Sequence, residues 1–285
     1  MRGTLLVGLA LLVAGLTGCI GEAPEASSPV AGDRGTPEPA GPTLVYEDCV
    51  EYLITFYIDL EQAVDLLPEG LEPRTYESTL EGTPVASEPA AQIRVPMGSC
   101  EVLVDGKPVG QVREMYVYVM IEPPEGFARA GADGHSYILT LFTDHPEVLA
   151  VHQAGGNRAA TLGQVNVGSG TPDPADTGPV TITATANRAS ATFEGTLVGQ
   201  ENPANTEFAG SWRFVLADQQ QGITGAADLD WDGQAAYHAA GRGSFTYEQG
   251  NVTVTTDEGE LLQAGGDWTW EMVYTPLEDA EGGGR

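Results

Sequence analysis

The chain has 285 residues, 41% of them hydrophobic, and a formal net charge of -29 from 41 acidic against 12 basic residues. A surface this negative repels phosphate backbones and anionic headgroups, which argues against nucleic-acid binding and against peripheral adsorption to lipid. The acidic residues are dispersed among apolar segments, so the composition does not indicate a simply disordered chain. Dispersed Asp and Glu with Lys107 as the only lysine resemble proteins of salt-loving organisms, where high ionic strength screens self-repulsion.

The N-terminus predicts an export signal. An unbroken apolar run from Leu5 to Leu16 follows Arg2; it is too short to span a bilayer comfortably and it ends in small residues. The tetrapeptide "LTGC" resembles a lipobox, in which the signal is cut before the cysteine and the cysteine takes the lipid. We therefore expect residues 1–18 to be a lipoprotein signal peptide and Cys19 to be lipidated, with the protein anchored in the cell membrane and facing outward. An ordinary secretory signal with an incidental cysteine is the alternative.

The rest of the chain divides by composition. Residues 19–43 are rich in Pro, Gly, Ala, Ser and Glu, which is typical of an extended, solvated tether after the lipidated cysteine. We expect one folded domain over 44–277 and a disordered tail over 278–285. Cys49 and Cys100 form an even pair in an oxidising compartment, so we predict a disulfide that closes a loop of about 50 residues and stabilises the fold by about 4 kcal/mol. Two buried free thiols are the alternative.

Within the folded domain the dominant pattern is β. A strand up to Val104, a turn at Asp105-Gly106 and a long strand over 108–121 predict a hairpin. Four later segments alternate apolar and polar residues between Gly, Asn and Asp: "VTITATANRASATFEGTLVGQ", "GSWRFVLADQ", "GSFTYEQGNVTVTT" and "GDWTWEMVYTP". This pattern indicates a mainly β protein of the α+β kind, with an antiparallel barrel that is closed or nearly closed, because closure removes exposed strand edges.

Two short helices are predicted, over 59–67 and 144–154. Each begins with an acidic N-cap, Asp59 or Asp144, followed three residues later by Gln or Glu. Pro68 ends the first helix and a Gly-Gly pair ends the second. The apolar contacts expected from them are Leu60, Val64 and Leu67 on the first helix and Val148, Leu149 and Val151 on the second.

Three segments, in this order, resemble the acetoacetate decarboxylase-like superfamily: "YLITFYIDLEQAVDLLPEGLEP", "VGQVREMYVYVMIEP" and "SYILTLFTDHPEVLAVHQAGGN". The resemblance implies a cone-shaped antiparallel β-barrel with an internal pocket. In the decarboxylase, a lysine after the last of these segments forms a Schiff base with a β-keto acid. Here that region reads "NRAATLGQVNV", where Arg158 stays protonated and forms no imine, while Lys107 lies in the predicted hairpin turn. We therefore expect no Schiff-base decarboxylation.

One family residue carries over, Glu114, which matches the strand glutamate that lines the family's pocket. Val112, Tyr116 and Tyr118 share its face by alternation. A buried carboxyl without a lysine beside it would have a raised pKa and could donate a hydrogen bond to a ligand. Because pleating permits only one inward face, the alternative is the set Arg113, Met115, Val117 and Val119.

The histidines form no recognisable metal pattern. His145 and His152 stand seven residues apart on the second predicted helix, whereas two ligands on one helix more often stand four apart. His135 and His238 have no fixed relation to them. We interpret His145 and His152 as surface residues.

Asp228, Asp230 and Asp232, with Gly233, reproduce the first half of a calcium loop, but Ala239 stands where a bidentate glutamate is needed. Alternation offers another reading, in which the aspartates face water and Asp232-Gly233 makes a turn. In that reading the inward residues are Leu229 and Trp231. We predict no metal site and no cofactor, and the sequence contains neither a nucleophile elbow nor a phosphate loop. Asn251 begins a glycosylation sequon.

These features predict a lipid-anchored extracytoplasmic protein that binds a small, partly apolar molecule. The membrane is its expected partner through the lipid, and Glu114, Tyr116 and Tyr118 are the expected pocket residues. One alternative is a lyase or hydratase that uses Glu114 as general acid or base. The other is a surface protein whose barrel serves only as a scaffold.

Overall fold

The computed structural model describes residues 41–76, 79–80, 83–84, 89–165, 178–186, 188–197, 207–218, 222–234, 239–250 and 252–276. All of them belong to one compact unit, Glu38–Arg285. The predicted signal peptide, Cys19, nearly all of the tether, His238, Asn251 and the tail lie outside the described residues. Within those ranges, no helix has the length and apolar character needed to cross a membrane.

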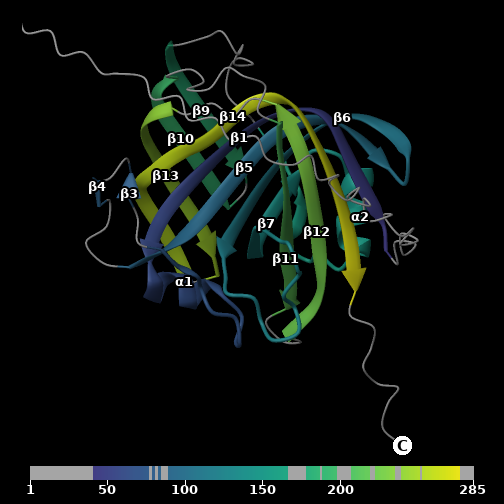
Figure 1. Cartoon of the computed structure of the whole chain (residues 1–285), viewed down its shortest axis with the longest axis horizontal. Coiled ribbons are helices and arrows are strands. Elements are labelled where there is room, and N and C mark those ends of the chain that lie inside the picture. The colour runs from purple at the N-terminus through teal and green to yellow at the C-terminus, as the bar shows by residue number, and fades with distance from the viewer. Residues whose placement is uncertain are drawn as a thin grey trace, which may run out of the picture. The chain divides into compact units, whose positions relative to one another are not determined.

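The structure is mainly β with two short helices (Figure 1). In chain order the elements are β1 (Thr43–Asp59), α1 (Leu60–Leu66), β2 (Thr75–Tyr76), β3 (Thr79–Leu80), β4 (Thr83–Pro84), β5 (Ala90–Val104), β6 (Lys107–Met120), β7 (Gly134–Thr143), α2 (Pro146–Ala154), β8 (Ala160–Leu162), β9 (Gly178–Ala186), β10 (Ala189–Leu197), β11 (Glu207–Asp218), β12 (Gly222–Gln234), β13 (Ala239–Gln249) and β14 (Val252–Pro276).

Seven strands form a closed barrel in the order β1-β5-β6-β7-β11-β12-β14, and pairing between β1 and β14 completes the ring. The predicted barrel is therefore confirmed. One detail of it was wrong, because β7 and β11 run parallel, with Trp212 opposite Gly134. Antiparallel neighbours usually follow one another through a tight turn, whereas α2, β8, β9 and β10 intervene between β7 and β11. The barrel is consequently mixed.

A second layer extends from the long strand β14. β1 pairs with most of β14, from Gly259 to Val273. The C-terminal part of β14 also pairs with β12, while its N-terminal part pairs with β13, which is followed by β10 and β9. In Figure 1 β9, β10 and β13 lie together on one side of the barrel strands. Phe245 of β13 stacks on Phe56 of β1, with ring centroids 5.0 Å apart, inside one apolar cluster. Parts of β1, β5 and β6 are thereby buried on both faces.

The β5–β6 hairpin and the disulfide are as predicted. Asp105 and Gly106 both have positive φ, 47° and 74°, as a two-residue hairpin turn requires, and Lys107 beside them is exposed. Cys49 and Cys100 form a disulfide with Cα atoms 4.1 Å apart, which joins β1 to β5.

A β-bulge in β1 makes this geometry. Between Glu47 and Val50 the strand carries one residue more than its partner β5, and Asp48 there has a φ of 50°. The extra residue reverses the alternation of side chains along the strand. Tyr46 and Cys49, three residues apart, consequently belong to the same buried cluster.

Both helices form where predicted, but their details differ. Asp59 makes no side-chain cap on α1, which buries Ala63 and Leu66 and leaves Val64 54% exposed. Leu60 and Leu67 of the predicted apolar face pack partly buried against the core, but the prediction was wrong for Val64, because burial follows the surface that β1, β5 and β14 offer.

In α2 the N-cap residue is His145. The carboxylate of Asp144 instead accepts a hydrogen bond of 2.9 Å from the backbone N–H of Arg113. Val148 and Val151 are buried as expected, and the helix ends at Gly155. A side chain on Gly155 would collide with the ring of Tyr274, so the helix end packs directly on β14.

Candidate functional site

A cavity of about 260 Å³ lies among the barrel strands. Its wall is formed by side chains of β1, β5, β6, β11, β12 and β14. Six of these residues are aromatic: Tyr116, Tyr118, Trp212, Phe214, Trp231 and Trp270. Leu53, Pro96 and Leu229 add aliphatic surface. The wall also contains one acidic residue, Glu51, and one basic residue, Arg94. A mostly apolar concavity with few polar groups is typical of a small-molecule site.

The pleat of β6 directs Tyr116 and Tyr118 into this cavity. Of the alternative set, Arg113 is exposed, while Met115, Val117 and Val119 are buried in the other apolar cluster. The sequence was ambiguous because both faces of β6 are largely covered. One face lines the barrel interior and the other packs against the second layer.

Glu114 is buried, 6% exposed, but it does not line the large cavity. It borders an adjacent void of about 10 Å³. The hydroxyl of Tyr116 donates a hydrogen bond of 2.8 Å to Oε2 of Glu114. Tyr116 therefore belongs both to the cavity wall and to the surroundings of Glu114.

His152 completes a buried polar network around Glu114. Its Nε2 lies 3.0 Å from Oε1 of Glu114, and its Nδ1 is hydrogen-bonded to the hydroxyl of Tyr274. The hydroxyl of Tyr46 lies 3.4 Å from both the Tyr116 hydroxyl and His152 Nε2. We call these five residues, Tyr46, Glu114, Tyr116, His152 and Tyr274, the interior network.

The prediction that His152 is a surface residue was wrong, since its side chain is 0% exposed. Val151 and His152 lie three and four residues after Val148, one helical turn further on, and all three are on the buried side of α2. Its place in the apolar stripe was the available signal. His145 is only half-buried.

Glu114 is expected to be ionised. Burial by itself raises the pKa of Glu114, but the neighbouring His152 and the hydroxyls of Tyr116 and Tyr46 outweigh it and hold this pKa below its usual value. The prediction of a raised pKa at Glu114 was therefore wrong, because the sequence did not reveal His152 as its neighbour. Burial and the nearby carboxylate raise the pKa of Tyr116 well above its ordinary value, so its hydroxyl keeps its proton.

The sequence analysis did not predict the acidic and the basic residue on the cavity wall, Glu51 and Arg94. Glu51 is 5% exposed, and burial raises its pKa to about 8. Arg94 lies over the Trp212 ring, 5.1 Å from its centroid, and its Nη2 donates to Oε1 of Gln92 at 3.3 Å. Arg94 interrupts the apolar run "AAQIRVPM", which was a signal for a special position. Glu51 had no such signal, since the bulge that turns it inward is invisible in the pattern.

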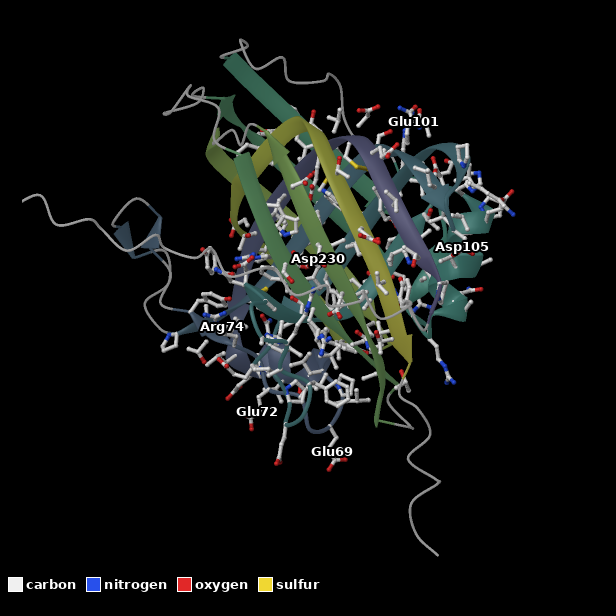
Figure 2. All side chains as sticks on the ribbon, turned by 45° about the vertical axis from the view of Figure 1, so that its right-hand side comes forward. Glu69, Glu72, Arg74, Glu101, Asp105 and Asp230 are labelled. Atoms are coloured by element: carbon white, nitrogen blue, oxygen red, sulfur yellow. A yellow bond between two sulfur atoms is a disulfide. The ribbon has the colours of Figure 1, made fainter. Side chains whose placement is uncertain are left out.

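The three aspartates of β12 lie in a continuous strand. The predicted turn at Asp232-Gly233 was wrong, since β12 runs on to Gln234 paired with β11. Asp228 accepts two hydrogen bonds of 2.7 Å from Arg213, and Asp230 forms an ion pair of 2.9 Å with Arg129. Figure 2 shows Asp230 among the side chains over the strands that face the viewer. No group of three or more potential metal ligands occurs in the described part of the chain.

We predict that Glu51→Gln raises the free energy of unfolding at high pH. The folded pKa of about 8 lies above the unfolded value of about 4.3, so the folded state alone keeps this proton between them. Stability therefore falls as pH rises from about 4.5 to about 8, by up to several kcal/mol, and Glu51→Gln removes this loss. Urea unfolding of both proteins at about pH 5, 7 and 9 measures it. Parallel pH profiles for the two proteins would contradict the burial argument.

His152→Ala is expected to destabilise the fold by about 3–5 kcal/mol, because it leaves the Glu114 carboxylate buried without its basic neighbour. The control is His145→Ala at a half-buried position, with an expected cost below about 1 kcal/mol. Adding Glu114→Gln to His152→Ala should restore part of the loss. Equal costs for the two histidine variants, measured by chemical denaturation, would show that the interior network contributes no such coupling.

The chain matches no protein-family model and no curated protein significantly. It is similar to the solved structure of the enduracididine biosynthesis enzyme MppR complexed with the condensation product of pyruvate and imidazole 4-carboxaldehyde, with a TM-score of 0.49 and 13% identity over 92% of this chain and 97% of that chain. An acetoacetate decarboxylase-like enzyme from Sphingomonas wittichii RW1 has a TM-score of 0.48 and 9% identity, over 84% and 93% of the two chains. Acetoacetate decarboxylase from Legionella pneumophila subsp. pneumophila str. Philadelphia 1 has a TM-score of 0.44 and 11% identity, over 84% of this chain and 87% of that chain. Two of these three structures are thus described as an acetoacetate decarboxylase or an acetoacetate decarboxylase-like enzyme.

Proposed function

We propose that this protein is a lipid-anchored, extracytoplasmic binding protein whose barrel holds a small, partly apolar molecule. The observation that carries the proposal is the cavity of about 260 Å³ with six aromatic side chains on its wall. Aromatic side chains bury much apolar area with little loss of conformational freedom, which suits them to enclosing a ligand. In this proposal Cys19 carries the lipid and the residues after it form the tether.

The size of the cavity limits the ligand. Burial of about 150 Å² of apolar ligand surface contributes about 4 kcal/mol, which is comparable with the cost of immobilising a small molecule. Useful affinity therefore requires polar contacts as well. Glu51 and Arg94 on the wall, and the Tyr118 hydroxyl beside them, are the groups available for such contacts.

A covalent imine is not part of the proposal. Lys107, the only lysine, is exposed in the β5–β6 turn and does not line the cavity. Arg158 is exposed after α2 and is permanently protonated.

A second candidate function, a lyase or hydratase, is favoured by one observation. Tyr116 lines the cavity and donates its hydrogen bond to an ionised Glu114, behind which His152 and Tyr274 continue the interior network. In such an enzyme, Tyr116 would exchange a proton with the substrate and Glu114 would receive it. Turnover of a hydroxy acid or enoic acid that disappears in Tyr116→Phe would support this function over simple binding.

For the binding function, we predict that Leu53→Trp abolishes ligand binding by filling the cavity from β1. The measurement is thermal stabilisation of the full chain by a panel of small aromatic and aliphatic acids, amides and alcohols. A compound at about 100 times its Kd stabilises the unmodified protein by about 2.7 kcal/mol, and this gain should vanish in Leu53→Trp. Val64→Trp, on the exposed face of α1, is the matched control and should keep the gain. Equal stabilisation of all three proteins, or of none, would count against binding in this cavity.

For the anchor, Cys19→Ala is expected to move the protein from the membrane fraction to the soluble fraction. Removal of the modified cysteine removes both acyl chains, and the acidic surface provides no other attraction to lipid. Fractionation and mass spectrometry of the N-terminal peptide test this. A membrane-bound Cys19→Ala protein, or an unmodified cysteine in the parent, would exclude the proposed anchor.

A further inference from the structure

We infer that the molecule bound in this cavity is an amphipathic monocarboxylate: its carboxylate pairs with Arg94, and its opposite end carries an uncharged hydrogen-bonding group that meets Glu51. The inference rests on the proposed binding function and names the ligand class. It depends on the charge and hydrogen-bond partners of Arg94 and Glu51 and on their positions along the cavity.

Arg94 is a cation without a counter-charge among the described residues. Its guanidinium has five N–H donors, of which one bonds Gln92, and its Nε is buried without an acceptor. Its other neighbours include the Trp212 ring and the hydroxyls of Tyr118 and Tyr76, all of them uncharged. No carboxylate in the described part of the chain forms an ion pair with it. An unpaired charge at a half-buried, aromatic-walled position is costly, and an anionic ligand group would compensate it.

The geometry favours a carboxylate and a single negative charge. The planar guanidinium fork matches the two oxygens of a carboxylate. One guanidinium neutralises one unit of charge, while the formal charge of -29 on the chain disfavours a ligand with more. The carboxylate of Glu114 already accepts hydrogen bonds from Tyr116 and His152 in the interior network, so it does not compete for Arg94.

Glu51 lies at a different point along the cavity. On neighbouring strands, Arg94 is opposite Thr55 and Glu51 is opposite Gly98, which separates their backbone positions by four residues, or roughly 13 Å along the strands. Their side chains come closer together, since both interact with the Tyr118 hydroxyl. Leu53 and Pro96, opposite one another, form the wall between them. A ligand that reaches both ends must therefore have an apolar middle.

The Glu51 carboxyl makes no hydrogen bond or ion pair with the described part of the chain, although its side chain is buried. With a pKa near 8 it is protonated at neutral pH and presents one O–H donor and free acceptor capacity. A hydroxyl or carbonyl group of the ligand can form a hydrogen bond with this carboxyl. A second ligand carboxylate would be disfavoured here, because no positive charge among the described residues is paired with Glu51 to compensate it. The cavity volume, equal to about nine water molecules, limits the middle to one ring or a short chain.

The test compares matched probes on the full chain by calorimetry: 4-hydroxyphenylacetate, its neutral amide, and phenylacetate, which lacks the hydroxyl. The acid should bind at least about tenfold more tightly than the amide, because only the acid pairs with Arg94. Arg94→Gln should abolish this preference, whereas Arg113→Gln, an identical change at an exposed position on β6, should keep it. Glu51→Leu should keep the acid preference but remove the advantage of the hydroxylated acid over phenylacetate.

The outcomes separate the ligand class from the binding function. An amide that binds as tightly as the acid, or an acid preference that survives in Arg94→Gln, overturns the inference while leaving the cavity a binding site. Absence of binding by all three probes, with neutral compounds still stabilising the protein, also overturns the ligand class alone. If Arg94→Gln does not fold, Arg94→Lys replaces it, with an acid preference reduced about tenfold because the bidentate contact is lost.

Discussion

The bulge in β1 is the constraint on which the interior of this protein depends. β1 pairs with both β5 and β14 and so closes the barrel, but its alternation reverses at the bulge around Asp48. Beyond that point the residues of the Cys49, Glu51 and Leu53 series face inward, whereas strict alternation from Tyr46 would turn all three outward. The disulfide to β5 and the carboxyl at one end of the cavity both follow from one extra residue.

The interior has two regions with ionisable side chains, the interior network and the cavity wall, and Tyr116 belongs to both. In the interior network, the carboxylate of Glu114 is compensated by His152 and by tyrosine hydroxyls that keep their protons. On the cavity wall, the neighbours of Arg94 in the described part of the chain are aromatic or amide side chains, and Glu51 stays uncharged at neutral pH. A saturated polar network stabilises a unique core, while unsatisfied groups around a cavity remain available to a ligand. This contrast supports the proposal that the cavity, and not the interior network, is the binding site.

Features that depend on residues adjacent in the sequence were predicted well. The β5–β6 hairpin followed from Asp105-Gly106, whose turn geometry is local. The position of α2 followed from Pro146 and the Gly-Gly pair, yet its capping did not, because Asp144 bonds the backbone of Arg113 on another strand. Similarly, Val64 is exposed on α1, although the apolar pattern of the helix predicts its burial. In a helix this short, the surface against which the helix packs determines which face is buried.

By itself, the sequence determined that the protein is rich in strands and that it forms a hairpin at Asp105-Gly106, and it predicted the Cys49–Cys100 pair that the structure contains. Only the tertiary structure decided the surroundings of Glu114, Arg94 and Glu51. The physical reason is that these surroundings arise from contacts between residues far apart in the chain, such as Glu114 with His152 on a packed helix, and from a bulge and a second layer that cover both faces of a strand. Alternation identifies the two faces of a strand, but it does not identify what covers each of them.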